Sequence, residues 1–512
     1  MNPAAPRRTP WPLIAVAGFA ALLAAVPVLY LGVRISDAGP DGIATVLSRS
    51  RLPGLLFNTL LLGASVTTSA IVLGVLSALV LARLRMPAPG ILAAAAVLPL
   101  AMPSYLAAFG WLATFPTMNG FWPSWLVLTL VTVPYVTLAA TTALHTGSTA
   151  FSDVARTLGH GPVRVFFRVT WPSIRTATLA AALLVFLYTI ADFGGVALFR
   201  YPVLTTAISQ AYGATFDRNY AAILAASLVL VALVVLTVER RMRPHREFAS
   251  SPSAPARQPA RPGVTLLAVA GLLIAPVGAV VVPVLALLIR LVNAQTVREL
   301  DPARLANAAL ATLILSAAGA LLAVLLALPI ATLAARHSSR IARVIETAGS
   351  LPLALPGIVV GLGLVFFSLN AVPALYQSAA VLAFAYGLLF LPKAIGTVRA
   401  SIERVPRSLE DVARTLGYGP IATWRRVTAR LSRPGILVAT LFITVTAMKE
   451  LPATILLRPT GMNTLAIELW SKTSITAFGA AVPYAIALLA LAAIPAVLLA
   501  PRADRVHTGV GA

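Results

Sequence analysis

DVARTLG, residues 153–159, recurs unchanged at residues 411–417, and each copy is followed by Gly-Pro one residue later. Each copy is a polar, arginine-flanked stretch between apolar runs long enough to cross a bilayer. A second pair, PLAMP at residues 99–103 and PLALP at residues 352–356, has nearly the same spacing, 253 residues against 258. Matched motifs at such a spacing indicate an internal repeat. We therefore expect two equivalent halves.

The composition is that of a membrane protein. Of 512 residues, 59% are hydrophobic and 11% are charged, and the mean hydropathy is +0.90. Soluble domains carry about 25% charged residues, and a spanning helix needs about 20 apolar residues. The sequence predicts an all-α polytopic bundle of about 12 transmembrane helices. The apolar runs lie near residues 11–33, 54–82, 88–113, 124–145, 176–199, 219–238, 264–289, 307–335, 347–370, 376–398, 434–457 and 477–500.

The formal net charge of +23 is explained by topology. Excess lysine and arginine often indicates nucleic-acid binding, but here the arginines gather in alternate loops, as cytoplasmic loops require. We therefore expect both termini in the cytoplasm, the lipid bilayer as surroundings and no nucleic-acid partner. The first apolar run, after Arg7 and Arg8, is expected to stay as a helix and not to be removed as a signal peptide. The absence of cysteine excludes disulfides and thiolate metal sites.

The repeat divides the chain into a first half at 1–239, a linker at 240–263 and a second half at 264–512. The linker is rich in proline, serine and arginine and lacks apolar periodicity, which predicts a flexible cytoplasmic connection. Six spans in each half, both starting on the same side, make two six-helix parallel repeats.

The first copy of the repeated motif extends over residues 151–172. We expect a short helix, a turn and a second, basic amphipathic stretch at the membrane surface. Asp153 suits the first turn of a helix, because carboxylates complement its N-terminal dipole. Gly159 suits the turn. The alternative is an interfacial loop that only connects two spans.

These segments resemble the signature loop of the permease subunits of bacterial ABC importers. That loop reads Glu-Ala-Ala, three residues, Gly, nine residues, then Ile-x-Leu-Pro. The matching positions are Asp153, Ala155, Gly159, Asp411, Ala413 and Gly417. The departures are Asp for Glu, Val for the first Ala, Trp171 for Leu, and Ala429-Arg430 for the final Leu-Pro. The resemblance implies a type I importer permease in which each copy couples to one of two cytoplasmic ATPase subunits.

A second resemblance concerns the solute. Residues 448–454 and 457–461, with residues 191–195 and 205–208 of the first half, are similar to fused ferric-iron-type permeases. This implies import of ferric iron, delivered by a periplasmic or lipid-anchored solute-binding protein, across the bacterial inner membrane. Related permeases carry thiamine, polyamines or phosphonates, so these solutes remain open. An ion-coupled secondary transporter is the alternative class, but it gives no reason for the two motif copies.

Two acidic residues occupy matched positions in apolar surroundings. Asp192 and Glu450 are 258 residues apart, and Arg200 and Arg458 keep that spacing. An ionisable group inside a bilayer costs roughly 2.5–3.5 kcal/mol and usually faces a cavity or a partner. Together with Lys449, these residues are candidates for the translocation pathway or its gate. The alternative is that they fix helix ends.

The chain has no phosphate-binding loop of the G-x-x-x-x-G-K-[ST] type and no nucleophile–base constellation. We therefore expect a transport subunit and not an enzyme, without a cofactor of its own, with ATP and magnesium held by the partner ATPase. The histidines and acids show no metal-ligand spacing, so no durable metal site is expected. Prolines 99, 103, 352 and 356 should break helices at matched places.

Overall fold

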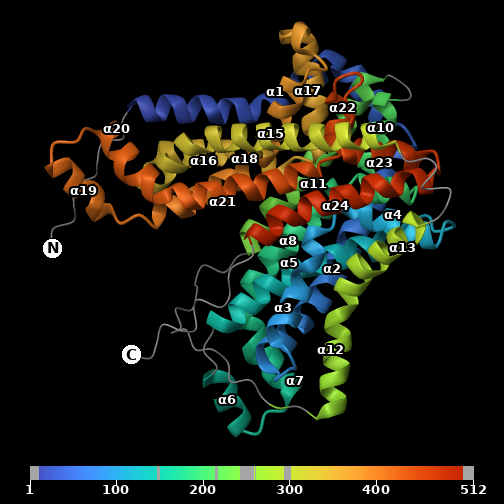
Figure 1. Cartoon of the computed structure of the whole chain (residues 1–512), viewed down its shortest axis with the longest axis vertical. Coiled ribbons are helices and arrows are strands. Elements are labelled where there is room, and N and C mark those ends of the chain that lie inside the picture. Colours follow the sequence, from blue (N-terminus) through green and yellow to red (C-terminus); the bar gives the residue numbers. More distant parts are fainter. Residues whose placement is uncertain are drawn as a thin grey trace. The chain divides into compact units, whose positions relative to one another are not determined.

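A computed structural model of the protein describes residues 11–146, 150–213, 217–242, 259, 261–292 and 301–499. The described chain folds into helices (Figure 1). They form two compact units. Unit 1 comprises Met1–Asp37, Leu300–Lys472 and Pro483–Ala512, and unit 2 comprises Ala38–Glu299 and Thr473–Val482.

Most helices belong entirely to one or the other unit. Those of unit 2 are α2 (Arg51–Arg83), α3 (Pro89–Val97), η1 (Leu98–Ala101), α4 (Ser104–Thr114), α5 (Phe121–Thr146), α6 (Ala150–Thr157), α7 (Pro162–Val165), η2 (Phe166–Thr170), α8 (Trp171–Ala191), α9 (Gly194–Leu198), α10 (Leu204–Gly213), α11 (Arg218–Met242), α12 (Pro262–Pro276), η3 (Val277–Val281) and α13 (Val282–Leu291). Those of unit 1 are α15 (Pro302–Arg336), α16 (Arg340–Gly349), η4 (Leu351–Ala354), α17 (Gly357–Ala371), η5 (Pro373–Leu375), α18 (Ala379–Glu403), α19 (Arg407–Thr415), α20 (Pro420–Thr423), η6 (Trp424–Thr428), α21 (Ala429–Met448) and α22 (Pro452–Leu457). Three helices contribute residues to both units: α1 (Trp11–Leu47), α23 (Leu465–Ser474) and α24 (Phe478–Leu499).

The all-α polytopic fold expected from the sequence is confirmed. In the described ranges, nine helices are long and apolar enough to cross a membrane, or up to eleven if each of two bent helix pairs is one span. The sequence predicted about twelve. The remaining apolar run corresponds to α24, which extends over the 22 residues Phe478–Leu499.

The two bent spans lie at the matched proline motifs. Helices α3 and η1 meet α4 at 94°, and α16 and η4 meet α17 at 103°. Each bend falls within a Pro-x-x-x-Pro motif, residues 99–103 and 352–356. Proline lacks an amide hydrogen and clashes with the preceding turn, so it favours a kink or a break in a helix. The expected helix breaks are confirmed.

The compact units are not the contiguous halves of the sequence, because each half gives its first span to the other unit. Gly363 of α17 packs on Pro27 of α1, whose carbonyl oxygen lies 2.6 Å from where a Cβ on Gly363 would stand. At the matched position in unit 2, a Cβ on Gly110 of α4 would lie 2.4 Å from the Cα of Pro283 in α13. Each glycine therefore permits a backbone contact that a side chain would prevent.

Further contacts hold each exchanged helix. The indole Nε1 of Trp111 donates to the carbonyl of Gly278 in η3 at 2.9 Å. In unit 1, Tyr30 packs edge-on against Phe367 with ring centroids 5.0 Å apart. The predicted boundaries at 239/240 and 263/264 remain boundaries of the sequence repeat, and most of the linker lies outside the described residues.

Each unit contains an equivalent internal hydrogen bond. A buried threonine on the long central helix, Thr59 of α2 or Thr312 of α15, accepts a hydrogen bond from the backbone at the start of a later helix. The donors are Leu204 of α10, at 3.0 Å, and Leu465 of α23, at 2.9 Å. The repeat therefore extends from the motifs to the way the helices are joined.

Candidate functional site

Each copy of the DVARTLG motif forms a helix, a glycine turn and a second helix, as the sequence predicted. The first repeated segment consists of α6, α7 and η2 (150–170), and the second of α19, α20 and η6 (407–428). Their second helices continue into the long helices α8 and α21. Each segment therefore sits at the end of a membrane span.

The same turn ends the first helix of each segment. Gly159 and Gly417 have φ angles of +82° and +85°, which lie in the left-handed region that favours glycine. The next residue donates its amide back to the first helix: His160 to the carbonyl of Ala155 and Tyr418 to that of Ala413, both at 3.1 Å. This is the glycine-terminated helix end that satisfies the last free carbonyls.

Each segment presents apolar side chains outward at matched positions. Leu158 and Leu416 are 71% and 72% exposed. We call the exposed sets the apolar triads: Val154, Leu158 and Val163 in the first segment, and Val412, Leu416 and Ile421 in the second. Ala155 and Ala413 are instead buried against the protein. Contiguous exposed apolar side chains rimmed by charges mark an interaction surface.

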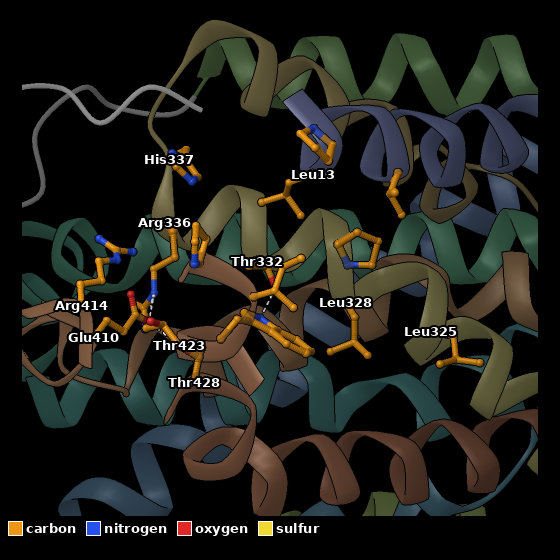
Figure 2. Close-up of a pocket in the computed structure, with 16 residues that line it drawn as sticks. Leu13, Leu325, Leu328, Thr332, Arg336, His337, Glu410, Arg414, Thr423 and Thr428 are labelled. Atoms are coloured by element: carbon orange, nitrogen blue, oxygen red, sulfur yellow. Dashed lines mark hydrogen bonds and ion pairs between the residues drawn. The ribbon is translucent and has the colours of Figure 1, made fainter. Parts of the chain in front are cut away.

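A buried ion pair anchors the second segment (Figure 2). Arg336, the last residue of α15, donates to Oε1 of Glu410 at 2.9 Å and to the carbonyls of Ile402 and Val405 at 3.0 Å. The hydroxyl of Thr428 donates to the same Oε1 at 2.7 Å. The side chains of Arg336 and Glu410 are 11% and 5% exposed, so the pair is desolvated and fixes α19 on the end of α15.

The first segment is anchored by the matched arginine and threonine. Arg83, the last residue of α2, donates to the hydroxyl of Thr170 at 2.8 Å. The position matching Glu410 is Ser152, whose side chain lies outside the described residues, as does that of Asp153. Asp411 lies 3.6 Å from Arg414. The sequence analysis missed this anchor, and its signal was an arginine ending each long helix, 253 residues apart.

A cavity of about 620 Å³ adjoins the second anchor. Its walls are the N-terminal turns of α1, the second half of α15 and the second segment (Figure 2). The side chains along α15 change from Leu325 and Leu328 to Thr332 and then Arg336. The cavity therefore changes from an apolar end at Leu325 and Leu328 to a polar end that holds the ion pair of Arg336 and Glu410.

Asp192 fixes a helix start in unit 2. Its Oδ1 accepts the amides of Gly195 at 3.0 Å and Val196 at 3.2 Å, at the start of α9. Its Oδ2 accepts the hydroxyl of Ser104, and its carbonyl accepts the hydroxyl of Thr205 at 2.7 Å. Asp192 is buried, with both carboxylate oxygens bonded to the protein. These contacts match the helix-end role left open by the sequence.

Glu450 occupies the corresponding place in unit 1. Its Oε1 accepts the amide of Ala453 at 3.1 Å, at the start of α22. The charge of Glu450 also interacts with that of Lys393, a residue of α18 that the sequence analysis did not single out. Lys449 and Lys393 carry like charges and repel each other.

The matched arginines lie in other surroundings. Arg458 donates to Asn463, which in turn donates to Glu468 at 2.7 Å. Arg200 has a φ of +54° in the turn after α9. The carboxylates of Asp192 and Glu450 are instead bonded by the hydroxyl of Ser104 and by backbone amides. In the part of the chain described, no three histidines or acids gather as metal ligands.

Comparison with known proteins agrees with this architecture. Residues 323–505 match the family described as binding-protein-dependent transport system inner membrane component. The Fe(3+)-transport system permease protein FbpB 2 of Haemophilus influenzae is 32% identical over 502 residues, which cover 96% of this chain and 99% of that protein. The chain belongs to this permease family. It is thus a multi-pass inner membrane permease of an ABC importer, which works with an ATPase and a solute-binding protein.

Other relatives match one half of the permease or less. The molybdenum transport system permease protein ModB of Mycobacterium tuberculosis is 30% identical over 249 residues, 45% of this chain and 92% of that protein. The putative 2-aminoethylphosphonate transport system permease protein PhnV of Salmonella typhimurium is 32% identical over 124 residues, 24% of this chain and 46% of that protein. A match of one half to a whole relative is expected of a fused chain, and membership of the family decides against an ion-coupled secondary transporter.

Proposed function

We propose that this permease imports ferric iron. The support is the relative whose name specifies Fe(3+) transport and which this chain matches from end to end. The relatives named for molybdenum and 2-aminoethylphosphonate match a smaller share. Thiamine, polyamine and phosphonate remain the alternative solutes, to be separated by uptake measurements.

We propose further that each repeated segment docks one copy of a cytoplasmic ATPase subunit. The observation that carries this is the pair of apolar triads, which present the same three positions outward from the same helix–turn–helix. Two equal surfaces fit two copies of one partner. ATP and magnesium would be held by that partner, and both termini of the permease would lie on its side of the membrane.

Of the remaining sequence candidates, two are assigned to the translocation pathway in unit 1. Glu450 and Lys449 are half-buried charges at the end of α21, next to Lys393 of α18. Charges inside a transporter bundle line a route or pair with each other. Asp192, Arg200 and Arg458 are assigned to positioning the turns that follow α8 and α21.

Uptake of ⁵⁵Fe tests these proposals. Cells without another iron importer would express the permease together with its ATPase and its solute-binding protein. Leu158→Asp with Leu416→Asp should lower uptake about a hundredfold and prevent co-purification of the ATPase, because truncating or charging the centre of an interface costs 2 kcal/mol or more per site. Leu375→Asp is the control, since Leu375 is 47% exposed in η5, outside both segments.

The two proposals fail in different ways. Normal uptake by the double variant would refute the docking of the ATPase on the apolar triads. No ⁵⁵Fe uptake by the unaltered permease, with uptake of thiamine, a polyamine or 2-aminoethylphosphonate instead, would refute iron as the solute.

A further inference from the structure

The cavity beside the second segment has an apolar end and a charged end. Its volume of about 620 Å³ falls within the roughly 300–1,000 Å³ of small-molecule sites, which are mostly apolar with a few polar groups that fix orientation. Leu325 and Leu328 line one end, and the charged side chains of Arg336, Glu410 and Arg414 gather at the other (Figure 2). This arrangement fits an amphipathic molecule.

The two ends lie at different depths in the membrane. Arg336 is the last residue of α15, a helix long and apolar enough to cross a membrane. Leu325 comes 11 residues earlier, which is about 16 Å along the helix axis. Half of the hydrocarbon core is about 15 Å thick. The cavity therefore reaches from the level of the lipid headgroups into the acyl chains of the same leaflet.

The apolar wall of the cavity reaches the surface of two spanning helices. Val16 of α1 and Leu325 of α15 both line the cavity, and each is more than half exposed. Both helices are candidate membrane spans. A hydrocarbon chain can therefore enter the cavity from the side without displacing a helix.

The anchor at the charged end keeps a donor and an acceptor for a further partner. Arg336 donates through Nε and Nη2 to Glu410, Ile402 and Val405, and the bonds to Glu410 all reach Oε1. Among the described residues, Nη1 of Arg336 and Oε2 of Glu410 have no hydrogen-bond partner, and neither atom is sealed inside the protein. The guanidinium thus has a free edge beside the cavity.

The residues that line the cavity carry a net positive charge. Arg336 and Arg414 stand against a single carboxylate, that of Glu410. Arg414 also lies 3.6 Å from Asp411, but both side chains of that pair are more than 40% exposed, and exposed pairs contribute little. Arginine binds phosphate through strong, charge-assisted hydrogen bonds, and basic pockets between spanning helices bind phospholipid headgroups.

Unit 2 does not repeat the polar character of this cavity. Three polar residues of the lining have apolar counterparts in the first half: Thr332, His337 and Thr423 correspond to Leu79, Leu84 and Val165. The charged end is therefore a property of unit 1 and not a by-product of the repeat.

The first span of each half also differs in what its N-terminal part contacts. AVAG at residues 15–18 recurs at residues 268–271, so Val16 corresponds to Val269. Val269 packs on a hydrophobic cluster that joins α12 to α2 and α3 through Leu272, Leu81 and Leu92. Val16 instead lines the cavity. The protein supplies the apolar neighbours in unit 2, and in unit 1 the valine faces an open space.

We propose that this cavity binds one anionic phospholipid, with its phosphate at Arg336 and Arg414 and an acyl chain along Leu325 and Leu328. On the orientation proposed above, the lipid comes from the cytoplasmic leaflet. The bound phosphate contacts both α15 and the second segment, so it adds to the anchor that joins them. The site does not depend on which solute is imported.

The test is native mass spectrometry of the full-length permease purified in detergent and titrated with dioleoyl phosphatidylglycerol. Arg414→Gln should weaken binding of the first lipid about fivefold, the effect of one cation near a phosphate headgroup. Leu328→Trp should weaken it about tenfold or more, because the indole takes the space of the acyl chain in a cavity that has no room for both. In thermal unfolding, added phosphatidylglycerol should raise the melting temperature of the unaltered permease and not that of Leu328→Trp.

Two matched variants serve as controls. Arg156→Gln makes the same change at the corresponding position of the first segment. Leu310→Trp makes the same change on α15, at an exposed leucine that does not line the cavity. Both should bind the first lipid within about twofold of the unaltered permease. Circular dichroism shows whether each variant is folded.

The outcomes distinguish a lipid in this cavity from other occupants. Equal binding by the unaltered permease, Arg414→Gln and Leu328→Trp would overturn the proposal, as would equal losses in the test and control variants. Dioleoylglycerol, which lacks the phosphate, should bind at least about tenfold more weakly, and equal affinity would overturn recognition of the phosphate. Competition by glycerol phosphate at the concentration of the lipid would show a site for a free phosphate and would overturn the lipid. Equal affinity for dioleoyl phosphatidylethanolamine would overturn the preference for an anionic headgroup.

Discussion

The two repeated segments expose apolar side chains at the same three positions, and both anchors use a matched arginine and threonine, but Glu410 of the second anchor stands where the first segment has Ser152. Both end their first helix at a left-handed glycine and expose an apolar triad. Inward, the second segment is held by the buried pair of Arg336 and Glu410, whereas the first is held by Arg83 on the hydroxyl of Thr170. The exposed apolar surface is therefore duplicated, while the carboxylate behind it at position 410 is found in the second segment and not in the first.

The two matched carboxylates, Asp192 and Glu450, also occupy equivalent positions with different neighbours. Asp192 reaches a serine and two amides, and Glu450 reaches an amide across the space left by Gly357. In both, the acid caps the next helix, but a different neighbour completes the contact.

The largest effect is expected from Glu410→Ser, which gives the second segment the residue of the first. Arg336 would stay buried without its carboxylate, and breaking a buried pair in this way costs about 3–5 kcal/mol. Thermal or denaturant unfolding of the purified protein in detergent, followed by circular dichroism, measures the loss. Adding Arg336→Leu should recover part of it, because no charge is then left buried. Equal stability of Glu410→Ser and the unaltered protein would show that the anchor contributes little.

A middle effect is expected from Ser104→Ala in unit 2. The variant removes the hydroxyl that Asp192 accepts, and a hydrogen bond to a charged group contributes about 1.5–3 kcal/mol. The matched variant in unit 1 is Gly357→Ala, where the added Cβ would lie 2.6 Å from Glu450 Oε1 and must displace it. Both should lower the melting temperature. If only Gly357→Ala does so, the serine is not part of the support of Asp192.

The smallest effect is expected from Gly159→Ala and Gly417→Ala. No atom lies within 4 Å of a Cβ added at either glycine, so the cost is the left-handed backbone alone, roughly 1–2 kcal/mol. The two losses should be equal within error, since the turns are alike. Asparagine at the same positions should cost less than alanine. A clear difference between the two alanine variants would mean that the turns differ in a way their dihedral angles do not reveal.

The repeat, the all-α fold and the broken spans could be predicted because they depend on local pattern. Long apolar runs, Pro99–Pro103 and the spacing of DVARTLG are all readable along the chain. The contact of Arg336 with Glu410 joins residues 74 positions apart, and no local pattern pairs them. Lys393 was overlooked for a similar reason: no local pattern relates a single lysine in an apolar run to Glu450, which lies 57 residues further on. The exchange of first spans was equally hidden, because Gly363 and Pro27 are apolar residues among many others.

That exchange sets an order of events during synthesis. Gly110 is synthesised before Pro283, so the site on α4 against which α13 packs exists before α13 is made. Pro27 is made first and its partner Gly363 follows 336 residues later. At about 5–20 residues per second, α1 stays in the bilayer for roughly 15–70 s before its site exists. Crosslinking Pro27→Cys to Gly363→Cys on chains arrested at increasing lengths would date the contact. The first helix of the chain is thus among the last to be seated, and the half that is translated first becomes complete only when the second has begun.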